Sequence, residues 1–136
     1  MSTQEKQKLK QTAFTEAWRY IDNAKDALKK AGKQEDYYQD AKYVRSASGA
    51  AYNGMLIALD TFLKLKDIPL PRTNKKSIYW YRDNIGKLDR KLLNELNTVY
   101  HNLHILGYYE GELNSNTIQI GMEKAISIIN RIKPSN

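Results

Sequence analysis

The sequence predicts an all-α fold, an antiparallel four-helix bundle with long helices, on three observations. Apolar residues recur at steps of three and four along most of the chain, which is the period of a helix that buries one face. Alternating apolar and polar runs between turn pairs are missing, so strands are not expected. The 136 residues include only seven glycines and three prolines, and short connections between such helices favour antiparallel neighbours. We therefore expect residues 1–136 to form a single helical-bundle domain.

The first helix is expected from about Glu5 to Ala31. Its apolar stripe consists of Phe14, Ala17, Trp18, Ile21, Ala24 and Leu28. Gly32 should end this helix, because glycine readily takes the left-handed conformation that commonly follows a helix.

The second helix is expected from Gln34 or Asp36 to Leu65. Its stripe consists of Tyr37, Ala41, Val44, Ser48, Ala51, Met55, Leu59 and Phe62. Its middle, "SASGAAYNG" at residues 46–54, contains mostly small residues. Glycine inside a helix costs about 1 kcal/mol relative to alanine, so Gly49 and Gly54 need an explanation. They mark either a close approach by another helix or a kink.

The third helix follows a loop with two prolines, "DIPLPRTNKKS" at residues 67–77. Ser77 is a candidate N-cap for a helix that runs from Ile78 to about Leu106. This helix has the clearest apolar stripe of the chain: Ile78, Tyr81, Ile85, Leu88, Leu92, Leu96, Val99, Leu103 and Leu106. We expect Gly107 to cap it.

The fourth helix is expected to begin at Asn114 or Ser115, after a polar turn. Its apolar residues are Ile118, Met122, Ala125, Ile126, Ile129 and Ile132. Pro134 should stop it, because proline cannot continue a helix.

Composition excludes several classes of function. Cysteine is absent, which removes disulfides, thiol nucleophiles, iron–sulfur clusters and thiolate zinc sites. The first residues have no apolar segment of the signal type and no stretch approaches 18 apolar residues, so we expect a cytoplasmic protein with no membrane partner. Glycine-rich phosphate loops are missing, and no cofactor is expected. The net charge of +7 favours anionic partners such as nucleic acid, although lysine-rich helices are often simply solvated.

The only two histidines, His101 and His104, lie three residues apart and therefore on roughly one side of a helix. Such a pair could hold a metal ion, but a catalytic metal site needs a third ligand and the HExxH pattern is absent, so no metal site is expected. His101 could act as a general base, but no spacing provides it with a nucleophile. The simpler interpretation is one packed and one exposed histidine.

Tyrosines gather near these histidines. Tyr100, Tyr108 and Tyr109 surround the end of the third helix, and a second group, Tyr37, Tyr38 and Tyr43, lies near the start of the second helix. The sequence leaves open whether the fold brings both groups to the same end. Tyrosine rings can stack on nucleic-acid bases, but more often they pack with an exposed hydroxyl.

The densest positive charge lies in residues 72–91, where seven basic and two acidic side chains give a net +5. The candidate binding cations are Arg72, Lys75, Lys76 and Arg82, and Tyr79, Trp80 and Tyr81 lie among them. Basic residues interleaved with aromatic ones are typical of surfaces that bind single-stranded nucleic acid. The alternative is a solvated helix start. A basic helix start opposes the helix dipole, which favours a role for some of these charges.

The chain resembles the HEPN superfamily of four-helix domains, and within it looks most similar to a small uncharacterised bacterial family of that shape. Four features carry the resemblance: the alanine-rich "RSASGAAYNGMLIALDTFL" of the second helix, the proline-bearing loop, the long third helix, and "YHNLHILGYYEG" before a final apolar helix. Active members of the superfamily are metal-independent ribonucleases or toxins. Their motif is an arginine, four to six residues, and a histidine near a composite dimer site.

This sequence departs from that motif. The positions that would hold the arginine before His101 are Asn94, Glu95 and Leu96, and those before His104 are Asn97, Thr98 and Val99. The positive charge that would stabilise a phosphoryl-transfer transition state is therefore missing. The resemblance implies a non-catalytic bundle that binds a partner, as a homodimer.

The leading hypothesis from the sequence is a non-enzymatic binding or interaction module that associates with itself as a dimer or with a protein partner. The alternative is an RNA-binding or ribonuclease-related protein that uses residues 72–91 and the tyrosine–histidine cluster at residues 100–109. Under this alternative His101, His104, Tyr100, Tyr108 and Tyr109 contact the RNA. A third hypothesis is a small molecule or nucleotide bound at one end of the bundle.

Overall fold

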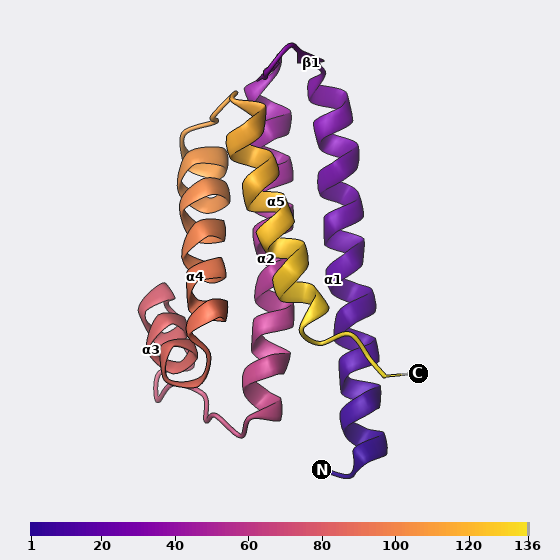
Figure 1. Ribbon diagram of the computed structural model, residues 1–136, viewed down its shortest axis with the longest axis vertical. Helices are drawn as coiled ribbons and strands as arrows, with labels where there is room; N and C mark the ends of the chain where they lie inside the picture. Colours follow the sequence, from indigo (N-terminus) through magenta and orange to yellow (C-terminus); the bar gives the residue numbers. More distant parts are fainter. Residues whose placement is uncertain (136) are drawn as a thin grey trace.

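The computed structural model describes residues 1–135, and these residues confirm the all-α prediction. The elements in chain order are α1 (Thr3–Ala31), β1 (Lys33–Gln34), β2 (Tyr37–Tyr38), α2 (Ala41–Leu65), α3 (Ile78–Leu88), α4 (Arg90–Val99), the π-helix η1 (Tyr100–Tyr109) and α5 (Ser115–Asn130). In Figure 1, α1, α2, α5 and the rod that α4 and η1 form lie side by side, and α3 lies beside the lower end of α4. None of the helices in residues 1–135 has the length and apolar character that crossing a membrane requires.

The core lies between the long helices, because each of them buries one apolar face. Fully buried side chains come from all four predicted stripes: Ile21, Met55, Leu59, Ile85, Leu92, Leu96, Leu103, Ile118 and Ile129. Burying one such side chain stabilises the fold by about 1.5–3 kcal/mol. The periodicity of the sequence therefore identifies the faces that pack together.

The first helix begins two residues before its predicted start, because Ser2 and Glu5 form a capping box. The Ser2 hydroxyl accepts a hydrogen bond from the Glu5 N–H at 3.1 Å, and the Glu5 carboxylate accepts one from the Ser2 N–H at 3.1 Å. Gly32 ends the helix at the predicted position and with a positive φ of 68°, but its conformation is not the left-handed helical one that was expected. Its ψ of 155° is extended, so the chain leaves the helix directly into β1.

The second helix begins at Ala41, so its predicted start at Gln34 or Asp36 is wrong. Residues 33–38 instead form a short antiparallel hairpin, β1–β2, which the sequence does not predict. Long-range contacts explain the difference: Tyr38 is buried, and its N–H donates to the Leu113 carbonyl at 2.8 Å. Asp40 then caps α2 by accepting a hydrogen bond from the Lys42 N–H at 3.0 Å.

The third helix is divided at Asp89, so the prediction of one helix from Ile78 to Leu106 is wrong. Asp89 has extended backbone angles, φ −159° and ψ 104°, and its side chain caps α4 by accepting from the Leu92 N–H at 2.9 Å. Its second carboxylate oxygen pairs with the Arg131 guanidinium at 2.5 Å. The apolar stripe does not reveal this break, because Ile85 and Leu92 are buried on both sides of it.

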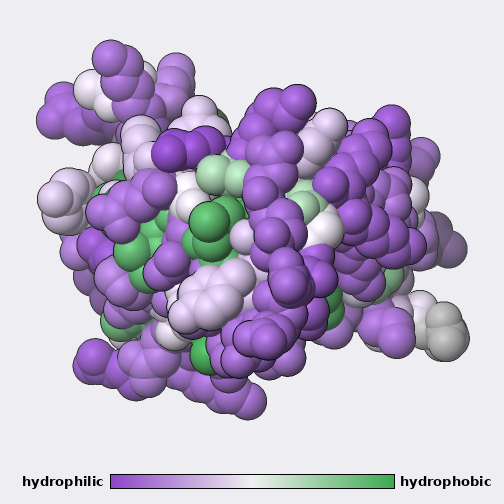
Figure 2. Space-filling model, turned by 90° about the horizontal axis from the view of Figure 1, so that it is seen from above, coloured by the Kyte–Doolittle hydropathy of each residue, from purple (hydrophilic) through white to green (hydrophobic). Residues whose placement is uncertain are grey.

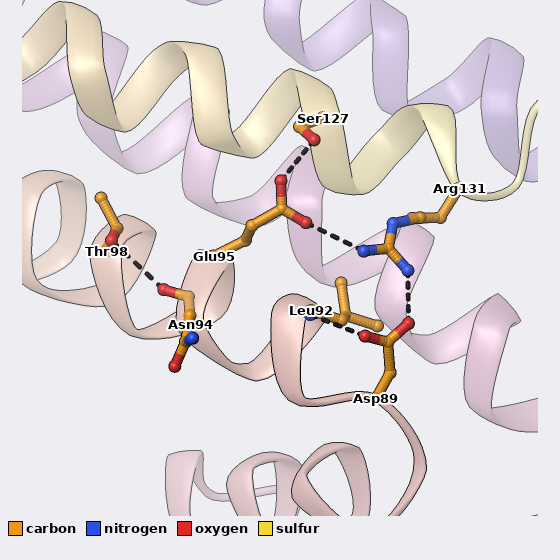
Figure 3. A network of polar contacts seen from close by, with 7 residues as sticks. All are labelled: Asp89, Leu92, Asn94, Glu95, Thr98, Ser127 and Arg131. Carbon is orange, nitrogen blue, oxygen red and sulfur yellow. Dashed lines mark hydrogen bonds and ion pairs between the residues drawn. The ribbon is translucent and has the colours of Figure 1, made fainter.

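A polar network joins α4 to α5 (Figure 3). Glu95 is only 5% exposed, and its carboxylate accepts hydrogen bonds from the Ser127 hydroxyl and from the Arg131 guanidinium, the latter at 3.2 Å. Arg131 therefore binds two carboxylates: that of Asp89, where the third helix is divided, and that of Glu95 within α4. A buried carboxylate needs such partners, because burying an unpaired charge is very costly.

The small residues of α2 allow close contacts between helices. A Cβ atom added at Gly54 would lie 3.0 Å from the Ala17 carbonyl oxygen and 3.0 Å from the Tyr20 Cβ, so α1 and α2 touch here backbone to backbone. A Cβ at Gly49 would lie 3.1 Å from the Tyr108 ring. The helix is continuous from Ala41 to Leu65. Of the two interpretations that the sequence offers for these glycines, the close approach is the one observed.

Candidate ligand-binding site

The end of the third helical rod is a π-helix, η1, rather than the capped α-helix that the sequence predicts. Gly107 does not end the helix: it lies buried inside η1, where an added Cβ would lie 2.1 Å from the Ser48 hydroxyl oxygen of α2. The helix ends two residues later, at Tyr109, and Gly111 makes the turn with φ 66°. π-Helices are rare and are frequently found at functional sites.

Five aromatic side chains of η1 and α2 form one cluster, here called the aromatic stripe: Tyr52, Tyr100, His104, Tyr108 and Tyr109. The His104 ring is its centre, with the Tyr100 ring at 5.1 Å and the Tyr108 ring at 6.1 Å, both nearly parallel to it. The Tyr52 ring of α2 stacks on His104 at 4.5 Å. Tyr109 meets His104 edge-on at 5.0 Å, with an angle of 81° between the rings.

A pocket of about 290 Å³ opens beside the stripe. Its walls are Gly49, Tyr52, Asn53, His104, Tyr108 and Tyr109. The outer rings remain open to solvent, with Tyr108 45% and Tyr109 61% exposed. Four rings and a single amide therefore surround a space large enough for a small planar group.

An arginine lies at each end of the stripe. The Arg82 guanidinium, from α3, lies 4.9 Å from the centre of the Tyr100 ring and is held there by a 2.8 Å hydrogen bond from Nε to the Asn97 side chain. Arg45, from α2, donates to the carbonyl oxygens of Tyr108 at 3.0 Å and Tyr109 at 2.5 Å. It thereby satisfies carbonyl groups that the end of a helix leaves without partners.

The two stacked rings at the centre of the stripe, Tyr52 and His104, are uncharged at neutral pH. Burial lowers the pKa of His104, so its imidazole is neutral. Burial, and to a lesser degree the neighbouring Tyr100 hydroxyl, raises the pKa of Tyr52 to about 12, against the opposing effect of Arg82. The site therefore presents neutral ring faces with positive charge only at its ends.

Acidification should destabilise the fold through His104, and a phenylalanine at this position should reduce the effect. The pKa of His104 is lower in the folded than in the unfolded protein, so the unfolded state binds the proton more readily. Its stabilising contribution is complete above the unfolded value of about 6.5 and is lost as the pH falls below it. Urea midpoints between pH 5 and 7.5 measure this for the wild type and His104→Phe. A urea midpoint that depends on pH as steeply in His104→Phe as in the wild type would contradict the assignment.

Residues 12–134 match the family described as a domain of unknown function, DUF5618. The chain belongs to the DUF5618 family. Among solved structures it is similar to a protein of unknown function from Dyadobacter fermentans, with 37% sequence identity and a TM-score of 0.79 over 90% of this chain and 94% of that chain. No curated protein matches the sequence. Every residue of the aromatic stripe lies within the part that matches the DUF5618 family.

The fold of this DUF5618 chain brings together five of the predicted binding residues: Tyr100, His104, Tyr108, Tyr109 and Arg82. The other predicted residues lie elsewhere. His101 is exposed on η1, and Lys76 pairs with Asp60 at 2.9 Å. Arg72 and Lys75 are exposed in the loop between α2 and α3, and within residues 1–135 they make no cation–π contact with a ring of the stripe.

Three residues of the site were missed by the sequence analysis: Tyr52, Asn53 and Arg45. Tyr52 had a signal, since it is the one large side chain in the small-residue run between Gly49 and Gly54. Arg45 had none, because its carbonyl partners are 63 and 64 residues away in the chain. In the part of this DUF5618 chain that the structure describes, no three His, Asp or Glu side chains gather in a way that could hold a metal ion.

Proposed function

We propose that this DUF5618 chain is a non-catalytic binding module whose binding surface is the aromatic stripe. One observation carries the proposal: four rings from two helices line an open pocket, and two of them are about half exposed although the molecule has a well-formed core. Exposed rings that converge on one pocket gain contact area when a planar ligand covers them.

Single-stranded RNA fits this surface best. Nucleobases stack on aromatic side chains, and the exposed rings of Tyr108 and Tyr109 are open to such stacking. Arg82 supplies positive charge next to Tyr100, which suits a phosphate that follows a stacked base. The net charge of +7 favours the same class of ligand.

Support for a non-catalytic role comes from the position that the HEPN motif reserves for its arginine. Glu95 stands at one of the candidate positions, and its carboxylate is buried in the network with Ser127 and Arg131. The central His104 is stacked between rings instead of facing a nucleophile. The resemblance to the HEPN superfamily itself stays a prediction.

The test titrates the purified protein into labelled single-stranded RNA at about 50 and 200 mM salt, and follows anisotropy and RNA length together. Binding should weaken steeply with salt, because it releases counterions from the phosphates. Tyr109→Ala and Tyr52→Ala should each raise the Kd about 5- to 140-fold, which corresponds to about 1–3 kcal/mol for one stacked base.

Tyr79 provides the matched control, since it is 72% exposed on α3 and lies outside the stripe. Tyr79→Ala should leave the Kd unchanged. The RNA proposal fails if the wild type does not bind at low salt, or if Tyr79→Ala weakens binding as much as Tyr109→Ala. Shortened RNA would contradict the non-catalytic role. Tetramethylammonium serves as a further probe, because an aromatic cage for cations would bind it whereas a stacking surface would not.

Self-association is a second candidate. Large apolar side chains are exposed near one end of the molecule, on β2, at the end of η1 and early in α5: Tyr37, Tyr109 and Ile120. Figure 2 views this end and shows a largely hydrophilic surface with hydrophobic residues gathered near its middle. A second copy could cover these side chains. Sedimentation equilibrium under the conditions of the RNA experiment distinguishes self-association from RNA binding. The fraction of dimer would rise with protein concentration and would change little with salt.

A further inference from the structure

A second pocket, of about 320 Å³ and with other walls than the pocket of the aromatic stripe, lies between the last turns of α2, the loop after it and the first turn of α3. Its walls contain four apolar side chains, Leu63, Ile68, Leu70 and Trp80, and three charged ones, Asp60, Lys64 and Lys76. A mainly apolar cavity with a few polar groups on one side is the usual form of a small-molecule site.

The charged side of this pocket is only partly neutralised. Asp60 uses both carboxylate oxygens: one accepts from the Tyr81 hydroxyl at 2.6 Å and the other from the Lys76 ammonium at 2.9 Å. Lys76 therefore balances Asp60. Within residues 1–135, Lys64 forms no ion pair with a carboxylate. The lining keeps one uncompensated positive charge, which favours an anionic group in the ligand.

The apolar side of the pocket is held open to solvent by the loop. Leu70 is 65% exposed and stands between Pro69 and Pro71, which hold the backbone extended and prevent it from folding back onto the core. Trp80 also lines this pocket, and its ring meets the Tyr81 ring edge-on at 5.1 Å, which helps to fix its position. A ligand with an apolar body would cover the exposed face of Leu70.

We propose that this pocket binds a small amphipathic carboxylate, with its apolar body against Leu70 and Trp80 and its carboxylate at Lys64. An amine of the same shape lacks the attraction to Lys64, and a neutral alcohol lacks the charge. The site shares no residue with the aromatic stripe. The inference therefore stands independently of the RNA proposal.

The test uses Trp80 as the reporter. The chain has two tryptophans, Trp18 and Trp80, so in the Trp18→Phe variant all tryptophan emission comes from Trp80. Octanoate should change this emission in a saturable way, whereas 1-octanol and octylamine should bind more weakly. Lys64→Ala should raise the Kd for octanoate about two- to fivefold, which is the range for an exposed ion pair.

Leu70→Asp is the second variant. It should abolish octanoate binding, because it puts a negative charge at the apolar rim, and it should leave the fold intact because Leu70 is exposed. Lys87→Ala, on the far end of α3, should leave the Kd unchanged. No saturable response to octanoate, or equal binding of octylamine, overturns the proposal. RNA binding should be the same with and without octanoate, so failure at one site leaves the other unaffected.

Discussion

Replacing Gly107 with alanine is expected to destabilise the fold by about 3 kcal/mol, the upper part of the range for an overpacked core. The new Cβ atom would lie 2.1 Å from the Ser48 Oγ and 2.6 Å from the Ser48 Cβ, and both residues are buried. Neither backbone can yield without separating η1 from α2. Urea denaturation followed by circular dichroism measures the free energy of unfolding of the variant and the wild type.

Two further variants make this result specific. In Gly86→Ala the nearest atom to the new Cβ is the Leu93 Cδ2 at 3.4 Å, an ordinary contact, so this helical substitution should stabilise the protein by up to about 1 kcal/mol. Ser48→Gly in the Gly107→Ala background removes both clashing atoms and should recover much of the loss. If Gly107→Ala behaved like Gly86→Ala, the close contact between η1 and α2 would be wrong.

Replacing Arg131 with methionine is expected to cost about 3–5 kcal/mol, because it leaves the buried Glu95 carboxylate without its cation. The same substitution removes the partner of Asp89 at the division between α3 and α4. Glu95→Met in the Arg131→Met background should restore part of the stability, since it removes the unpaired charge. Thermal and urea denaturation of the single and double variants measure both effects.

The comparison variant is Arg19→Met, which breaks the ion pair with Glu16 on the exposed face of α1. It should cost at most about 1 kcal/mol.

The pH dependence of stability gives a further test of the Arg131 network. The hydrogen bond from the Leu92 N–H, and then Arg131, lower the pKa of Asp89. The stability that Asp89 contributes is therefore complete above the carboxyl's ordinary pKa, and it is lost as the pH falls below that value and through the lowered pKa of the folded protein. Arg131→Met should lose less stability on acidification than the wild type. The same loss of stability in both proteins would contradict the role of the Arg131–Asp89 pair.

The helical faces could be predicted from the sequence because burial repeats along each helix with the same period as the apolar residues. Ile21, Leu59, Leu96 and Ile129 all lie on predicted stripes and are buried. The places where the helices break could not be predicted from this period. The stripe stays in phase across Asp89, so the break depends on the cap and on Arg131, which is 42 residues away.

Apart from Arg82 of α3, the part of the candidate site that the sequence predicts lies on one helix. Tyr100, His104 and Tyr108 are four residues apart, and that spacing indicates one face. Tyr52 and Arg45 reach η1 because α2 packs against it. The apolar period along one helix does not reveal which other helix packs against it. Lys76 shows the opposite error: its charge suggested a free binding cation, whereas the fold pairs it with Asp60.

The two ends of the aromatic stripe are attached differently. At one end Arg45 belongs to the long helix α2 and binds two backbone carbonyls of η1, so the rings beside it are clamped. At the other end Arg82 belongs to the short helix α3 and reaches the Tyr100 ring through its side chain alone, where the hydrogen bond to Asn97 of α4 holds it. A ligand larger than the pocket should therefore be accommodated at this end by rotation of the Arg82 side chain, whereas at the other end it would have to break two hydrogen bonds to the backbone of η1. Size selection by this surface should consequently be directional, strict beside Arg45 and tolerant beside Arg82.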